Sequence, residues 1–262
     1  MCPDDRDAGS FAAFLINQLI RCLLWADDLL LFSRKVTHIQ RQIDALERYC
    51  IRNKLCVNRS KTKVIYVHAG SDGSAHNQHV FTYGGTPLEN VNSYKYVGVW
   101  LDSKGTCEVQ AKEVLAKANK AMYMCMSKVR HISSNCPPLL RSTLFRAYVS
   151  THFTYCCEVV PYTRKHISNM NDIVYRYAKW ATGLPRNACR NSVLREAGLR
   201  PVHYDFLQAR MNYYLLLLSR NESHVTRAAL ADLKERVHTS AYSKWYKGIV
   251  NSFSKLSCQA TD

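Results

Sequence analysis

The sequence predicts a mixed α+β fold in which short antiparallel hairpins come first and helices fill the rest of the chain. Short apolar runs bounded by turn residues dominate residues 22–102, whereas from residue 107 onward apolar residues recur at steps of three and four. With 47% of its 262 residues apolar, the chain has ample material for a buried core. We therefore expect hairpins with covering helices in 1–106, a pair of helices in 107–160 and a helical region in 161–262.

The first hairpin signal lies at residues 22–32, where Asp27 and Asp28 stand between two apolar arms. This pattern predicts a tight hairpin with the acids at or beside its apex. Two carboxylates about 4 Å apart repel by roughly 4 kcal/mol at an effective dielectric of 20, and we expect the apolar arms to exclude the water that would weaken this repulsion. A shared proton or Mg²⁺ would compensate the pair. The alternative is a chance pair, like Asp4 and Asp5.

Helical and strand patterns surround this hairpin. The apolar run 11–20 predicts a short buried helix that leads into it, and Ser33 is the expected N-cap of an amphipathic helix that ends near Asn53. The apolar positions of that helix are Val36, Ile39, Ile43, Leu46 and Cys50. A basic turn then leads into a β-branched strand within 55–67.

Glycines punctuate the next strands. Gly84-Gly85 between 80–83 and 86–88 predicts a second hairpin. Residues 91–102 alternate as a half-buried strand, in which Gly98 indicates a bulge or a close approach by another backbone. The histidines of the preceding Gly- and Ser-rich segment are expected to be solvent-exposed, because no acid or cysteine stands at metal-ligand spacing. They are His68, His76 and His79.

Positive charge is concentrated in the middle of the chain. The net charge is +16, and residues 101–200 hold 16 Lys and Arg against 6 Asp and Glu. Such a field suits a polyanion, although many proteins are basic without binding nucleic acid. One apolar arc of the helix after residue 107 is formed by Ala111, Val114, Leu115, Ala118, Ala121, Met122, Cys125 and Val129. Its opposite side bears Lys112, Lys117, Lys120, Lys128 and Arg130, and the next helix, 139–155, bears Arg141 and Arg146.

Cysteine spacing and charge placement indicate the cellular compartment in which the protein is expected. The eleven cysteines include no C-x-x-C pair, so we expect reduced thiols in an intracellular protein, cytoplasmic or nuclear. The apolar segment 11–32 contains Arg21, Asp27 and Asp28, each of which costs roughly 2.5–3.5 kcal/mol at a membrane centre. We therefore expect no membrane span, and the acidic start is unlike a signal peptide.

The acid pair also carries a family resemblance. Trp25-Ala26-Asp27-Asp28 resembles the aromatic-x-Asp-Asp box of reverse transcriptases, with Trp25 where Tyr or Phe is more usual, and 29–33 is similar to the form in non-LTR (LINE-type) retrotransposons. The resemblance implies a palm-domain hairpin in which Asp27 binds catalytic Mg²⁺ and Asp28 supports it. It implies an RNA template and a DNA primer as partners.

Two further motifs follow in the family's order. Residues 55–63 fit the element after the Asp-Asp hairpin, in which a lysine has been assigned to protonating pyrophosphate; Lys61 is our candidate, with Lys63 as the alternative register. Tyr96, Val97 and Gly98 resemble the Tyr-Leu-Gly primer grip. The resemblance thus implies a partial antiparallel palm sheet in 1–106 and thumb helices in 107–160, placed along the phosphates of the template–primer duplex.

The same resemblance exposes a gap in the metal site. Two-metal phosphoryl transfer needs acids from separate strands, and the family supplies one of them well upstream of the hairpin. Only 26 residues precede Asp27, and they show no strand pattern around an acid. We expect a polymerase fragment that cannot polymerise DNA alone and lacks an upstream polymerase part. The alternatives are a non-catalytic nucleic-acid-binding remnant that uses the basic helices, and a plain structural protein.

Overall fold

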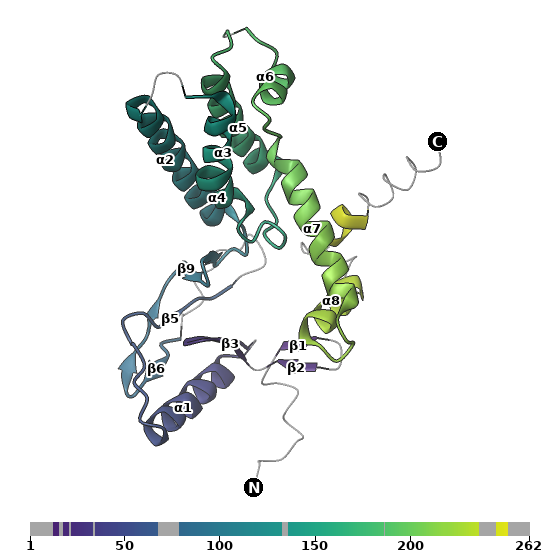
Figure 1. Ribbon diagram of the computed structural model, residues 1–262. Helices are drawn as coiled ribbons and strands as arrows, with labels where there is room; N and C mark the ends of the chain where they lie inside the picture. The colour runs from purple at the N-terminus through teal and green to yellow at the C-terminus, as the bar shows by residue number, and fades with distance from the viewer. Residues whose placement is uncertain are drawn as a thin grey trace. The chain divides into compact units, whose positions relative to one another are not determined.

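The computed structural model describes residues 13–15, 18–20, 22–33, 35–67, 79–132, 136–185, 187–235 and 245–250. The chain divides into two compact units, of which the first comprises 1–106 with 221–232 and the second comprises 107–220 with 233–262. Short strands belong to the first unit and a group of packed helices to the second (Figure 1). The expected α+β class is therefore confirmed.

The described strands of the first unit pair two by two. The antiparallel pairs are β1 (Ala13–Leu15) with β2 (Gln18–Ile20), β3 (Cys22–Trp25) with β4 (Asp28–Leu31), β6 (Thr82–Tyr83) with β7 (Thr86–Pro87), and β9 (Ser93–Tyr96) with β10 (Val99–Asp102). The fifth pair, β5 (Lys63–Val64) with β8 (Glu89–Asn90), is parallel. Each described strand has one partner, so these strands form separate ladders and not one continuous antiparallel sheet.

Two local predictions in this unit are wrong. The apolar run 11–20 was expected to be helical, but its described residues form the β1–β2 ladder, in which Phe14 pairs with Leu19. Periodicity does not separate a short apolar strand from a buried helix, and aromatic and β-branched residues favour the strand. Residues 91–102 form two strands joined by a turn at Val97 and Gly98, where one strand with a bulge was expected. The Gly84-Gly85 hairpin is confirmed.

Helix α1 (Val36–Arg52) covers the core of the first unit. The buried core residues are Ile43, Phe81, Tyr83 and Leu88, and Leu31 of β4 packs against them. The helix ends at Arg52 with Asn53 as its C-cap, as expected. Its N-cap is Lys35 and not Ser33, whose hydroxyl accepts a hydrogen bond from the Lys35 N–H. Because Leu31 is anchored on this core, the Asp-Asp hairpin is attached to α1.

The second unit consists of helices that pack side by side around an apolar interior (Figure 1). They are α2 (Glu108–Ile132), α3 (Pro138–Leu144), the π-helix η2 (Phe145–Ser150), α4 (Thr151–Thr154), α5 (Arg164–Thr182), α6 (Arg190–Glu196) and α7 (Val202–Ser219). Most of helix α8 (Val225–Glu235) belongs to the first unit, and 245–250 is a further helical segment of the second. The expected helix 139–155 is thus interrupted by a π-turn.

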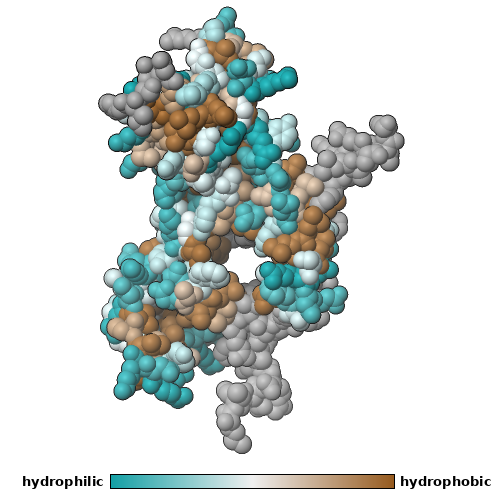
Figure 2. Space-filling model, viewed as in Figure 1, coloured by the Kyte–Doolittle hydropathy of each residue, from teal (hydrophilic) through white to brown (hydrophobic). Residues whose placement is uncertain are grey.

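The apolar faces of α2 and α5 are buried. On α2 every residue of the apolar arc is buried except Leu115, which is half-buried. On α5 Met170 and Tyr177 are inaccessible to solvent, and the helix ends at Gly183, whose φ of 67° is the left-handed cap that glycine favours. Apolar side chains also lie on the surface (Figure 2). The exposed apolar residues include Met124 of α2 and Leu139 of α3.

Candidate functional site

A two-residue turn presents the acid pair. Trp25 pairs with Asp28 across the β3–β4 ladder, so the turn consists of Ala26 and Asp27, and Asp28 opens β4. The φ of Ala26 is +53°, a region that alanine enters at a cost of roughly 1–2 kcal/mol. Both acids are exposed to solvent. The prediction that they lie at or beside a hairpin apex is confirmed.

The surroundings of the pair are wetter than expected. Leu24 is 67% exposed and Trp25 is 70% exposed, so the first apolar arm does not exclude water from the acids. The second arm is half-buried because it packs toward the α1 core. All four residues of β3 are exposed, so neither face of this strand is covered. The expectation of a low dielectric around both carboxylates is therefore wrong.

The β9–β10 hairpin brings Tyr96 near the acid pair. Its turn residues Val97 and Gly98 have φ values of 44° and 79°, as a type I′ turn requires. Tyr96 is half-buried at the end of β9. Burial is the larger of two effects that raise the pKa of its phenol, and the negative charge of Asp28 is the smaller. Two motifs that are about seventy residues apart in sequence thus lie within electrostatic reach of each other.

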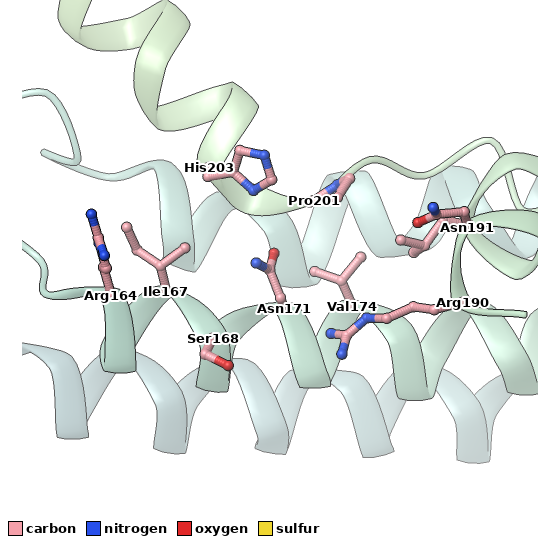
Figure 3. A pocket seen from close by; sticks show the side chains of 10 residues that line it. Arg164, Ile167, Ser168, Asn171, Val174, Arg190, Asn191, Pro201 and His203 are labelled. Atoms are coloured by element: carbon pink, nitrogen blue, oxygen red, sulfur yellow. The ribbon is translucent and has the colours of Figure 1, made fainter. Parts of the chain in front are cut away.

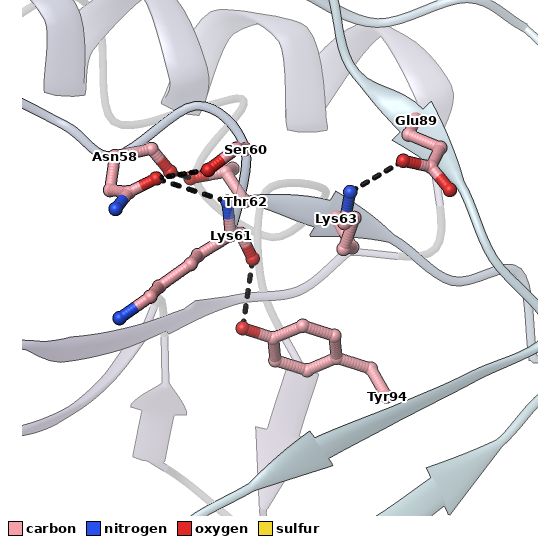
Figure 4. A network of polar contacts seen from close by, with 7 residues as sticks. All are labelled: Asn58, Ser60, Lys61, Thr62, Lys63, Glu89 and Tyr94. Carbon is pink, nitrogen blue, oxygen red and sulfur yellow. Dashed lines mark hydrogen bonds and ion pairs between the residues drawn. The ribbon is translucent and has the colours of Figure 1, made fainter.

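The loop before β5 fixes the backbone of Lys61. Asn58 Oδ1 accepts the Lys61 N–H at 3.2 Å, and the Lys61 carbonyl accepts the Tyr94 hydroxyl at 2.8 Å (Figure 4). The ammonium of Lys63 binds Glu89 at 2.5 Å, beside the parallel β5–β8 pair. The Lys61 side chain points away from this network and makes no ion pair with any described residue (Figure 4). Of the two lysines, Lys61 is the one whose ammonium is available to a ligand.

The cations expected on α2 are all solvent-exposed. They are Lys112, Lys117, Lys120, Lys128 and Arg130. Lys117 also binds Glu113 one turn earlier, at 2.9 Å, which offsets part of its charge. The α5 residue Arg176 adds a further exposed guanidinium, which donates to Asn119 and Tyr123 on α2. Sequence reasoning missed Arg176, since only the packing of α5 on α2 brings it to this side.

The arginines expected on the next helix have intramolecular partners. Arg141 donates to the carbonyl of Ala181 at 3.2 Å, and its guanidinium lies 5.2 Å from the ring centre of Trp180. Arg146 donates to the carbonyl of Gly198. Both guanidinium groups therefore tie helices together.

The acid pair fits one magnesium ion better than two. Mg²⁺ binds through one or two carboxylates plus substrate phosphates and water, which Asp27 and Asp28 can supply together with a nucleotide. The described part of the chain contains no group of three or more His, Cys, Asp or Glu side chains that could hold a metal. None of its helices is long and apolar enough to cross a bilayer.

Comparison of the sequence with known protein families and with curated proteins finds no match.

Proposed function

We propose that this chain is part of the RNA-directed DNA polymerase of a non-LTR retrotransposon. The observation that carries the proposal is the pairing of two motifs in the first unit. An exposed Asp-Asp turn and the Tyr96 hairpin lie within electrostatic reach, in the order that the sequence resemblance implies. The available ammonium of Lys61 supports the same proposal.

Each group has a defined task in this proposal. Asp27 and Asp28 hold Mg²⁺, which when bound stabilises charge on the phosphates of an incoming nucleotide. Tyr96, Val97 and Gly98 position the primer end. Lys61 donates a proton to the departing pyrophosphate, for which an exposed ammonium that forms no ion pair with the described residues is suited.

Metal binding tests the acid pair directly. Mn²⁺, which binds the same oxygen ligands and is detected by electron paramagnetic resonance, should bind the purified chain in the presence of a deoxynucleoside triphosphate. Asp27→Asn and Asp28→Asn should each abolish this binding. Glu222→Gln removes one exposed acid from a turn elsewhere and should leave it intact. Equal binding by all three variants contradicts the proposed metal site.

A second function is favoured by α2. Its cations are exposed, whereas the acid pair lacks a third acid among the described side chains. We propose that the chain binds duplex nucleic acid through α2 whether or not it performs chemistry. Duplex binding that persists in Asp27→Asn, together with the absence of Mn²⁺ binding at the acid pair, supports this second function. Primer extension that is lost in Asp27→Ala supports the first.

A further inference from the structure

The second unit contains a cavity that neither of these functions uses. It has a volume of about 430 Å³ and is formed by α5, α6 and the beginning of α7 (Figure 3). We call it the α5 groove. Its apolar lining includes Ile167, Val174 and Leu194. The volume lies within the range of roughly 300–1,000 Å³ that is usual for small-molecule sites.

Two guanidinium groups stand at opposite ends of the groove. Figure 3 shows Arg164 at one end and the Arg190 guanidinium beside Val174 at the other, with Ile167 and Asn171 between them. From residue 164 to residue 174 an α-helix rises about 15 Å, so the groove follows roughly three turns of α5. An apolar surface with an amide thus lies between two cations, and this arrangement is the observation on which the proposal below depends.

The two cations differ in how they are held. Arg190 binds Asp172 at 3.0 Å and lies 5.0 Å from the ring centre of Tyr175, which fixes its position. Arg164 is exposed and makes no ion pair with any described side chain. His203 lines the same groove. Because Asp172 offsets only one of the two arginines, the groove favours an anion.

The amide in the middle of the groove has a fixed orientation. Asn171 Oδ1 accepts the N–H of Val202 at 2.7 Å, so the amide NH₂ group of Asn171 remains as a donor. Asn191 lines the groove from α6 (Figure 3). Asparagine amides hydrogen-bond base edges well, and apolar side chains support the faces of unstacked bases.

We propose that the α5 groove binds one unpaired nucleotide of a single-stranded nucleic acid, with its flanking phosphates at Arg164 and Arg190 and its base over the apolar lining. The inference rests on the proposed nucleic-acid function of the chain and adds a single-strand site that is separate from α2. The Asn171 amide contacts the base edge.

Anisotropy of a fluorescein-labelled oligo(dT) strand tests the cation. Arg164→Glu should weaken binding at least about fivefold at 0.1 M salt, because one phosphate contact to a single strand is lost. Lys165→Glu makes the same charge change at the next exposed position, which does not line the groove, and should have a much smaller effect. Equal losses in the two variants overturn the proposal.

A steric pair of variants tests the groove itself. Ser168 lines it and Asn169, also exposed, does not. Ser168→Phe should weaken oligo(dT) binding at unchanged net charge, whereas Asn169→Phe should not, and both should melt at the wild-type temperature. Equal affinities of the two variants overturn the proposal.

Two further experiments distinguish a nucleic-acid strand from a free nucleotide as the ligand, and failure of the groove proposal from failure of the proposed function. Thymidine monophosphate should compete only at far higher concentration than unlabelled oligo(dT); equal potency overturns binding of a strand and assigns the groove to a free nucleotide. If the groove variants lose oligo(dT) but bind duplex normally, the groove proposal stands whatever happens at the acid pair. If the α2 variants alone lose both ligands, it fails.

Discussion

Neutralising three cations of α2 should weaken duplex binding and reduce its salt dependence. The triple variant changes Lys112, Lys120 and Arg130 to Gln, and all three side chains are exposed. Lys112 and Arg130 are five helical turns apart, so they lie on the same side of α2, about 27 Å from each other along the axis. Lys117 is left unchanged because its ion pair with Glu113 reduces its net charge effect.

The expected magnitude follows from counterion release. Each lost phosphate contact lowers the slope of log K against log salt by about 0.9, so three contacts lower it by about 2.7. At 0.1 M salt the same three contacts correspond to roughly a 500-fold loss of affinity, or about 3.7 kcal/mol. A purely solvated lysine face predicts no change in either quantity.

Fluorescence anisotropy with a labelled duplex at several salt concentrations measures both quantities. The control is a triple variant of equal charge change, with exposed cations taken from α5, α6 and the end of α7: Lys165, Arg195 and Arg220 to Gln. Its slope should stay near that of the wild type. The reasoning is refuted if the α2 variant keeps the wild-type slope, or if the control lowers it as much.

Three other predictions concern reactivity and stability. Iodoacetamide at pH 8 should modify Cys189 before Cys157, because a thiol with a lower pKa has a larger thiolate fraction. Backbone N–H groups of α6 lower the pKa of Cys189, whereas burial raises the pKa of Cys157 to about 12 and should leave it unmodified. Peptide mass spectrometry measures the order of modification. Thr163→Ala removes the side-chain cap of α5 and should lower the free energy of unfolding by about 1 kcal/mol in urea titrations, with no loss contradicting the cap. Gly84→Ala should cost roughly 1–2 kcal/mol by the same measurement, because φ there is +58° and the added methyl would lie 2.8 Å from Arg59 Nη2; wild-type stability would show that the turn relaxes.

The helices of this chain could be predicted because their burial is periodic. The apolar arc of α2 repeats over many turns, so one misplaced residue would not obscure it, and the end of α5 at Gly183 follows from glycine's access to positive φ. Strands of two to four residues give much weaker patterns. That is why 11–20 was assigned to the wrong class and why the parallel β5–β8 pair was not foreseen.

Contacts between residues distant in sequence determine which parts of the candidate site could not be predicted. Arg141 and Arg146 looked like free cations on a helix, but they donate to carbonyls 40 and 52 residues away. Likewise, the choice between Lys61 and Lys63 depends on Glu89, 26 residues beyond Lys63. Nothing in local spacing reports such contacts, because they arise from how elements pack. The acid turn was predictable since its signal is contained within eleven residues.

The exposure of the acid pair changes what a metal can contribute. Two unit charges 4 Å apart repel by about 1 kcal/mol in water, against about 4 kcal/mol at an effective dielectric of 20. Because Asp27 and Asp28 face solvent and Trp25 does not cover them, water already compensates much of their repulsion. The chain therefore has no need of a cation in order to fold around this turn. A divalent ion gains most there when nucleotide phosphates supply its remaining ligands, so metal and nucleotide should bind together.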